Sequence, residues 1–378
     1  MIFDKKQDTF NTFAEWYVWG MGTFMSPLYK VVPKALVEGD VENFLEAEED
    51  FYHFLKNMFQ DMYKQPEKYN LPLEPFIRHD QFSKKRLNVR RVARNGILDF
   101  LFQIGQVGIL DGERFMISQG VWYELLLHKN KIIKSKDGFL SIIEQLGFYV
   151  EEGQEVIINH TKYPKMLWAL CYFSKACAKD KKNSLRHFCR CDFRLFENHP
   201  LGFEDVLELL PESLGDEVIH TDRILTTLKY RRKIEYYDDH GYRIAYSNKA
   251  GVVFYCHVHS YKTKNYHHYM RWVLNTSQTT SLFQQLIEDN QEEIVNYICH
   301  HLHRCDPNCN PGYGASSPES CMARIKVNWD NQLLYTCKDK GCNIGSGPTD
   351  FKYLRILLEA TKKIVYADSN KTRNKKQK

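Results

Sequence analysis

The chain has 378 residues, of which 43% are hydrophobic and 14% aromatic, so it is long enough for two or three domains, each with its own core. It contains no run of about 18 apolar residues, which excludes an evident membrane-spanning segment. The net charge is +5, but five basic residues between Lys371 and Lys378 account for all of it. The remainder is formally neutral, and this argues against the phosphate neutralisation that nonspecific nucleic-acid binding requires.

Residues 1–83 are predicted to form a helical N-terminal region. Its longest helix should run from about Val41 to Tyr63, because the apolar residues recur at helical spacing and Pro66 disfavours helix at the residue before it. Carboxylates crowd the first half of this helix, where they suit the positive end of the helix dipole. We interpret them as a solvated face, with a cleft for a basic partner as the alternative. These carboxylates are Glu46, Glu48, Glu49 and Asp50.

Residues 84–160 have the element order of a winged-helix domain. The pattern predicts a helix, a strand, two helices and a hairpin, at about 88–104, 115–118, 121–128, 139–146 and 148–160. The helix that would enter the major groove carries Glu144, and only Gln145 in it could read base edges. A winged-helix-like segment that contacts protein, or is merely structural, is therefore favoured over a DNA-binding one.

Residues 161–304 are predicted to form an antiparallel-sheet domain with helices. Three strand-like runs, KIEYYDD, YRIAYSN and VVFYCHVHS, follow one another with short turns between them. Upstream, HFCRCDFRLF is interpreted as a strand in which Cys189 and Cys191 share a face. In the last run His257 and His259 also share a face, and such a pair can grip one metal ion. A half-solvated sheet face is the simpler interpretation of the two histidines.

A cysteine cluster closes this part of the chain. Five of the 11 cysteines lie between positions 305 and 342, as a C-x3-C pair, a single Cys321 and a C-x4-C pair, with a predicted hairpin between the pairs. Two loops that each offer two thiolates are the usual construction of a four-coordinate structural zinc site. Free thiols and an iron–sulfur cluster are the alternatives. The predicted zinc ligands are Cys305, Cys309, Cys337 and Cys342.

After the cluster, Pro348 and Thr349 are predicted to open an amphipathic helix that closes the 305–366 module. A disordered basic tail should follow at 367–378. The expected fold class is α+β, with a helical N-terminal region, a winged-helix-like middle, an antiparallel sheet with helices and a C-terminal cysteine-rich zinc-type module.

Several motifs together resemble a group of uncharacterised bacterial proteins. The motifs are a YPKM-type helix (YPKMLWALCYFSKAC), a CDFR-like strand (CDFRLF), the tyrosine-rich strands and the cysteine cluster. The resemblance covers about residues 88–365. It implies a cytoplasmic bacterial protein and carries over neither an activity nor catalytic residues.

The sequence contains no phosphate loop, dinucleotide fingerprint, zinc-protease helix or nucleophile elbow. Our preferred hypothesis is a non-catalytic regulatory or interaction protein with a structural zinc and a protein partner. The alternatives are a metal-dependent enzyme with a site near His257 and His259, and a winged-helix DNA-binding regulator that uses residues 84–158. We expect weak nucleic-acid binding at most and no membrane association. In an intracellular chain of this size, 11 cysteines favour thiols and metal ligands over disulfides, and the expected cytoplasmic location is what the resemblance implies.

Overall fold

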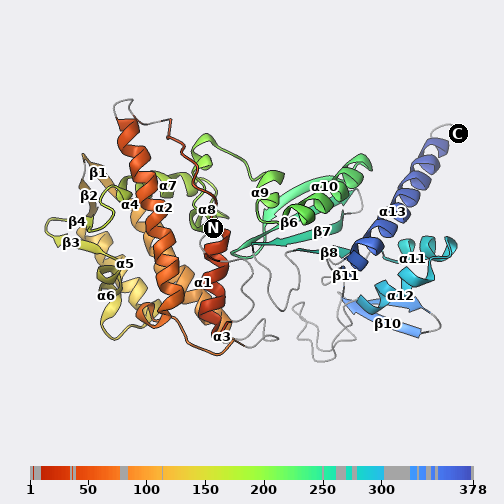
Figure 1. Ribbon diagram of the computed structural model, residues 1–378, viewed down its shortest axis with the longest axis horizontal. Helices are drawn as coiled ribbons and strands as arrows, with labels where there is room; N and C mark the ends of the chain where they lie inside the picture. Colours follow the sequence, from red (N-terminus) through yellow and green to blue (C-terminus); the bar gives the residue numbers. More distant parts are fainter. Residues whose placement is uncertain are drawn as a thin grey trace. The chain divides into compact units, whose positions relative to one another are not determined.

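The computed structural model describes most of the chain, and its elements are labelled in Figure 1. The described residues are 3, 10–34, 36, 40–76, 84–112, 114–248, 251–260, 270–274, 279–301, 324–329, 332–337, 342–344 and 348–375. They combine helices with antiparallel sheets, which confirms the expected α+β class. The chain divides into two compact units. The N-terminal unit is 1–200 with 260–265, and the C-terminal unit is 201–259 with 266–378.

Two helices begin the N-terminal unit. Helix α1 (Phe13–Phe24) starts at Thr12, whose hydroxyl accepts a hydrogen bond from the Glu15 backbone N–H at 3.1 Å, an N-cap that satisfies one orphan donor of the first turn. Helix α2 (Val41–Lys64) has the predicted extent and stops where Pro66 opens a 3-10 turn (Pro66–Tyr69, η2). The two helices pack against each other through their buried apolar faces.

The predicted order of helix, strand, two helices and hairpin is present in the next segment. A continuous helical stretch comes first, and its middle part is a π-helix. Four antiparallel strands then form a sheet in the order β1-β2-β4-β3, with two helices between β2 and β3. The elements are α3 (Lys84–Arg90), the π-helical η3 (Arg91–Leu98), α4 (Asp99–Val107), β1 (Ile109–Asp111), β2 (Arg114–Ser118), α5 (Gln119–Ile133), α6 (Gly138–Gln145), β3 (Phe148–Glu152) and β4 (Glu155–His160).

The expected strand over HFCRCDFRLF is wrong, because this segment is helical. Helix α8 (Ser184–Arg190) ends at Cys191, which has a left-handed backbone with φ of 54°, and a 3-10 helix (Phe193–Glu197, η4) follows. The Asp192 carboxylate accepts a hydrogen bond from the Arg194 backbone N–H at 3.2 Å and so starts that second turn. The apolar and cysteine residues of this segment alternate with polar ones in the sequence, as in a strand, but residues 188–191 are all buried.

Helix α7 (Met166–Cys177) lies at the centre of the N-terminal unit, against α2 and α4. On one side its Phe173 packs against Phe51 of α2, with ring centroids 6.2 Å apart. On the other side α4 approaches closely at Gly105, where a β-carbon would lie 2.2 Å from the Ser174 hydroxyl oxygen. This close crossing fixes the position of α7, and the first turn of α7 lines the pocket described below.

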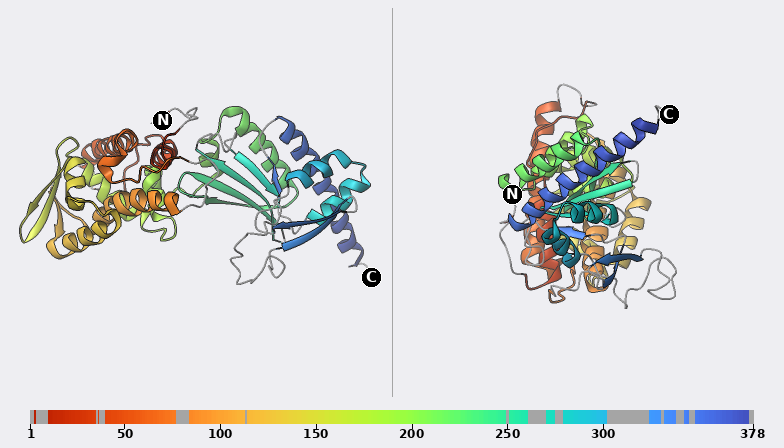
Figure 2. Two further views of the ribbon diagram at one scale, coloured as in Figure 1. Left: turned by 90° about the horizontal axis from the view of Figure 1, so that it is seen from below. Right: turned by 90° about the vertical axis from the view of Figure 1, so that its right-hand side faces the viewer.

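The C-terminal unit contains a five-stranded antiparallel sheet in the order β11-β8-β7-β6-β5, so the predicted three-strand meander is confirmed and extended by two strands. Helices α10 and α13 lie along one side of this sheet in Figure 2, and Tyr246 of β6 donates a hydrogen bond to Asp222 of α10 at 2.9 Å. The sheet strands are β5 (Arg231–Tyr236), β6 (Gly241–Asn248), β7 (Gly251–His259), β8 (Met270–Leu274) and β11 (Cys342–Ile344). The helices are α9 (Phe203–Leu207), α10 (Glu212–Thr227), α11 (Thr279–Glu288), α12 (Glu292–His301) and α13 (Pro348–Lys375).

The predicted hairpin between the cysteine pairs is also present. Strands β9 (Arg324–Trp329) and β10 (Gln332–Cys337) pair with each other as a separate two-stranded sheet. Helix α13 continues through Lys375 and so includes most of the segment predicted as a disordered tail. The division between the two units at residue 200 falls inside the segment predicted as one domain. Among the described residues, no helix is both long and apolar enough to cross a bilayer.

Candidate ligand pocket

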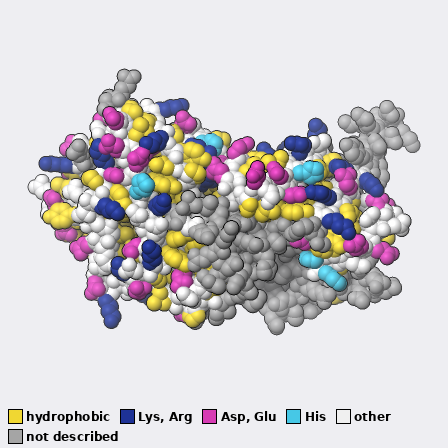
Figure 3. Space-filling model, viewed as in Figure 1, with side chains coloured by type: hydrophobic (Ala, Val, Ile, Leu, Met, Phe, Trp, Pro, Cys, Tyr) yellow, Lys and Arg dark blue, Asp and Glu magenta, His cyan; other side chains and the backbone are white. Residues whose placement is uncertain are grey.

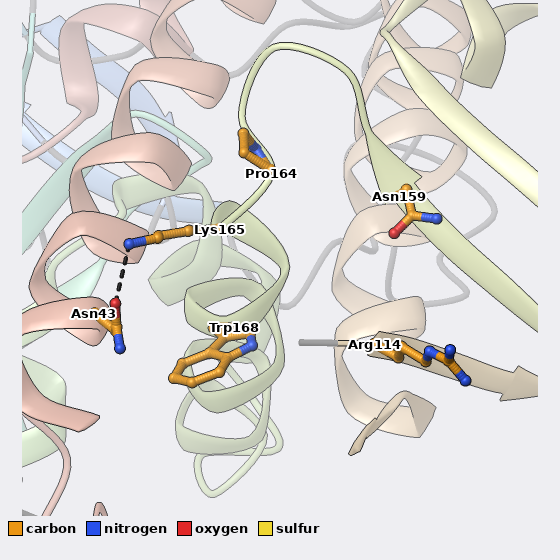
Figure 4. Close-up of a pocket in the computed structure, with 6 residues that line it drawn as sticks. All are labelled: Asn43, Arg114, Asn159, Pro164, Lys165 and Trp168. Carbon is orange, nitrogen blue, oxygen red and sulfur yellow. Dashed lines mark hydrogen bonds between the residues drawn. The ribbon is translucent and has the colours of Figure 1, made fainter. Parts of the chain in front are cut away.

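A pocket of about 360 Å³ lies within the N-terminal unit, between α2, α7 and the outer face of the four-stranded sheet (Figure 4). Its volume falls in the range of small-molecule sites. Two strands contribute one polar residue each, the start of α7 contributes three residues, and α2 contributes one. The lining residues are Asn43, Arg114, Asn159, Pro164, Lys165 and Trp168.

The sheet register places the two strand residues side by side. Phe115 of β2 pairs with Ile158 of β4, and both are buried. Because side chains alternate along a strand, the preceding Arg114 and the following Asn159 point to the opposite, exposed face. Tyr149 of β3 pairs with Asn159, so Tyr149, Asn159 and Arg114 form one row across three strands.

A buried histidine shapes the turn that leads from β4 into α7. His160 Nδ1 accepts hydrogen bonds from the backbone N–H groups of Tyr163 (2.9 Å) and Lys162 (3.2 Å), and Nε2 donates to the Leu146 carbonyl at 2.9 Å. Burial lowers the pKa of His160, partly offset by the bond to Leu146, so the imidazole is neutral and holds this tautomer. The chain therefore enters α7 in a defined conformation that presents Pro164 to the pocket.

Lys165 ties the start of α7 to α2. Its ammonium group donates to the Asn43 side-chain oxygen at 3.0 Å, the bond drawn in Figure 4, and forms an ion pair with Glu46. Its backbone N–H donates to the Asp50 carboxylate at 3.3 Å. Burial raises the pKa of Asp50, and the contact with Lys165 partly offsets that rise. The positive charge of Lys165 is thus balanced by α2 carboxylates.

Arg114 supplies the positive charge that a ligand could use. Its side chain is exposed, and Asp111 of β1 lies opposite it in the sheet register, although the described residues form no ion pair with it. The pocket also lies at the N-terminal end of α7, where the helix dipole favours negative charge. In Figure 4 Trp168 lies between the Asn43–Lys165 pair and Arg114, and the Arg114 side chain extends away from the indole. The arrangement suits an anionic ligand with a flat or apolar part.

The lining residues offer binding groups and no catalytic group. Two amides, two cations, an indole and a proline line the pocket, and none of these residues is a serine, cysteine, histidine or carboxylate. Nucleophilic and general acid–base catalysis normally use those side chains. A lysine amine can act as a nucleophile when it is neutral, but Lys165 is held in an ion pair with Glu46.

The predicted zinc ligands are only partly placed. Cys337 ends β10 opposite Arg324, and Cys342 begins β11 opposite Leu274. The C-x4-C pair therefore occupies the connection between the hairpin and the five-stranded sheet. Cys305 and Cys309 lie outside the described residues, and the zinc site stays a prediction.

The two histidines of β7 do not form a half-solvated face, so that expectation is wrong. His257 and His259 are each only 7% exposed. The ring of Tyr237 lies 4.1 Å from that of His257, centroid to centroid, and His240 lies 6.2 Å from His259. Within the described residues, no group of three or more His, Cys, Asp or Glu side chains could hold a metal ion. The metal-dependent alternative near this pair stays a prediction.

The carboxylates of α2 are likewise not one solvated face. Glu48 is fully buried, while Glu46 and Asp50 hold Lys165 at the pocket. Burial raises the pKa of Glu48 to about 8, against the lowering effect of the Val31 backbone N–H and the charge of Lys30. These carboxylates therefore serve separate roles, Glu48 in the core and Glu46 and Asp50 as partners of Lys165.

Sequence reasoning missed Arg114, Asn159, Asn43 and Trp168 as site residues. A signal existed only in the YPKMLWALCYFSKAC motif of the resemblance, which contains Pro164, Lys165 and Trp168. Comparison with known proteins gives no match, because no family model, curated protein or solved structure corresponds to this chain. The chemistry of the pocket therefore carries the functional argument.

Proposed function

We propose that the protein is a non-catalytic regulatory or interaction protein that binds a small anionic ligand in the pocket between α2, α7 and the four-stranded sheet. The observation that carries this proposal is the set of lining residues, which can bind a ligand and lack the usual catalytic groups. Arg114 is the main anion-binding group, because guanidinium matches carboxylate and phosphate geometry with two parallel hydrogen bonds.

Under this proposal the 84–160 segment is a winged-helix-like module that contacts protein. Its element order and sheet support the module, and its surface argues against duplex DNA. The exposed residues of α6 and of the β3–β4 hairpin include several acids, namely Glu144, Glu151, Glu152 and Glu155. On the face seen in Figure 3, basic and acidic side chains of the described residues are interspersed. A DNA-binding face would need clustered Lys and Arg.

The proposal includes a structural zinc held by Cys305, Cys309, Cys337 and Cys342. Its support is the cysteine spacing together with the β9–β10 hairpin, which ends at the second pair. Four thiolates leave no open coordination position for water, so this zinc would stabilise the module and take no part in catalysis.

Anion binding is tested by isothermal titration of the full chain with pyrophosphate at low ionic strength. We expect binding by the native protein and a loss of roughly tenfold or more in Arg114→Gln, since a charged hydrogen-bonded pair contributes about 1.5–3 kcal/mol. Arg231→Gln is the matched control, because Arg231 is also an exposed strand arginine but belongs to the C-terminal unit. Equal binding by both variants, or no binding by the native protein, would contradict the proposed function.

A further inference from the structure

We propose that the outer face of the four-stranded sheet is the surface with which the winged-helix-like module binds a partner protein, and that it takes a basic amphipathic helix. This inference rests on the proposed function, in which residues 84–160 contact protein, and it names the surface and the chemistry of the partner. It is carried by a row of apolar side chains on that face, by the carboxylates around the row and by the geometry of a sheet face.

An apolar row crosses three strands on the outer face. Ile109 of β1 pairs with Met116 of β2, and Met116 pairs with Ile157 of β4. The neighbouring Phe115 and Ile158 are buried on the inner face, so the row points outward, because side chains alternate along a strand. Ile109 is 60% exposed, and Met116 and Ile157 are half-buried. The outer face is therefore apolar at its centre.

An exposed tyrosine extends the apolar row onto the fourth strand. Tyr149 of β3 is 57% exposed and is a diagonal neighbour of Ile157, because its partner Asn159 lies two residues further along β4. Diagonal neighbours in a sheet lie about 7–8 Å apart, which is within reach of an aromatic ring. Two large exposed hydrophobic side chains, Ile109 and Tyr149, thus share one face. An exposed apolar patch with a polar rim is typical of a protein contact site.

The rim of this face is acidic. Arg114 is the one guanidinium that the four described strands direct outward, and Asp111 lies opposite it in the register. Two carboxylates remain in excess, since Glu151 lies opposite Ile157 at the end of the apolar row and Glu155 begins β4 on the same face. A partner that carries Lys or Arg beside its apolar residues complements this face. The same carboxylates repel a phosphate backbone.

The geometry of a sheet face favours a helix over an extended chain. An extended partner would leave its own backbone N–H and C=O groups unpaired against the apolar row, whereas a helix pairs its backbone internally. Helices packed on a sheet are a standard layer arrangement, and α5 and α6 already pack against these strands on the inner side. The apolar row spans three neighbouring strands, about 10 Å, which is the diameter of a helix. The matching helix has apolar residues three and four apart with basic residues beside them.

The test is fluorescence anisotropy of the full chain with a labelled amphipathic peptide of Leu and Lys, of about 18 residues so that it can form a helix. We expect saturable binding that weakens with salt, and binding roughly tenfold weaker for the same peptide with Glu in place of Lys. The double variant Ile109→Ser/Tyr149→Ser should bind the Lys peptide roughly tenfold less tightly, because it loses the exposed apolar anchors. Leu127→Ser is the matched control, since Leu127 is 58% exposed but lies on α5.

The acidic rim is tested by a second pair of variants. Glu151→Gln/Glu155→Gln should weaken binding of the Lys peptide and reduce its salt dependence, because the rim charges attract the basic side chains. Glu124→Gln/Glu144→Gln is the control, since both residues are exposed acids on the helices α5 and α6. Equal effects of the two double variants would show that the peptide responds to the net charge of the protein and would contradict the proposed surface.

Two further results would overturn the inference. If the native protein does not bind the Lys peptide, or if Ile109→Ser/Tyr149→Ser and Leu127→Ser bind it equally, the outer face is not the docking surface. If sedimentation shows a dimer of the native chain that Ile109→Ser/Tyr149→Ser dissociates, a second copy covers the face instead. Calorimetric titration with pyrophosphate separates this inference from the proposed ligand pocket. Native protein that binds pyrophosphate but not the peptide keeps the pocket and loses only this surface, and the Ser variants should bind pyrophosphate as the native protein does.

Discussion

Glu48 is a carboxyl group in the core of the N-terminal unit, with none of its surface exposed. Burial raises its pKa from 4.5 to about 8, so the folded protein holds this proton more tightly than the unfolded chain does. The contribution of protonated Glu48 to the free energy of unfolding is complete below the pKa of Glu48 in the unfolded chain. It is lost as the pH rises through the pKa of Glu48 in the folded protein. We therefore expect the free energy of unfolding to fall between pH 5 and pH 9, by at most roughly 4–5 kcal/mol from this group.

Glu48→Gln should remove that dependence, because a neutral amide has no proton to lose. Urea unfolding at pH 6 and pH 9 gives the change in the free energy of unfolding between the two pH values. Subtracting the change in the variant from the change in the native protein removes the contribution of the other titrating groups. Glu42→Gln is the matched control, since Glu42 is exposed on the same helix. An identical pH dependence in the native protein and Glu48→Gln would show that Glu48 is ionised in the fold.

At the scale of elements, the crossing of α4 and α7 depends on a glycine. A β-carbon at Gly105 would lie 2.2 Å from the Ser174 hydroxyl oxygen and 2.6 Å from the Leu170 carbonyl oxygen. Gly105→Ala must therefore push the helices apart, and we expect a loss of about 1–3 kcal/mol in the free energy of unfolding. Gly120→Ala in α5 is the control, because its β-carbon meets nothing within 4 Å and alanine favours helix. Thermal unfolding of both variants checks this; equal midpoints would contradict the close crossing.

The elements themselves could be predicted to very different degrees. Periodicity predicted α2 and the hairpin of β3 and β4, because each buries one face over many residues. It failed around Cys191, because the sequence alternates apolar and polar residues there although a left-handed residue joins two short helices. The pocket could not be predicted from the sequence, for another reason. Asn43, Arg114 and Trp168 come from separate elements, and only tertiary packing around α7 brings them together.

For the whole molecule, the distribution of charge predicts which residues are responsible for any binding of nucleic acid. All of the net charge of +5 can be assigned to the basic residues between Lys371 and Lys378, and α13 carries most of them. Replacing these five residues with Gln should abolish duplex DNA binding at physiological salt, since phosphate contacts supply the affinity. Fluorescence anisotropy at two salt concentrations measures this. If the variant with the five Gln replacements still binds one DNA sequence at physiological salt, and replacing Arg90 and Arg91 removes that binding, the DNA-binding alternative is favoured.

A zinc ion at the predicted site would tie the hairpin of β9 and β10 to the rest of the C-terminal unit. This hairpin is a two-stranded sheet, which is marginally stable by itself in water, and its last residue is Cys337. Five residues later Cys342 begins β11, which pairs with β8 and precedes α13. A metal held by both cysteine pairs would therefore supply much of the folding free energy of the module.

Elemental analysis of the purified chain should find one zinc per molecule. Replacing any one of Cys305, Cys309, Cys337 or Cys342 with Ser should release it, whereas Cys321→Ser should retain it. Chelation should expose β9, β10 and α13 to protease and leave residues 1–200 folded, because the metal would support only the module and the N-terminal unit has its own core. Protein without stoichiometric metal, in which all five cysteines of the cluster react freely with a thiol reagent, would show that the cluster holds no ion.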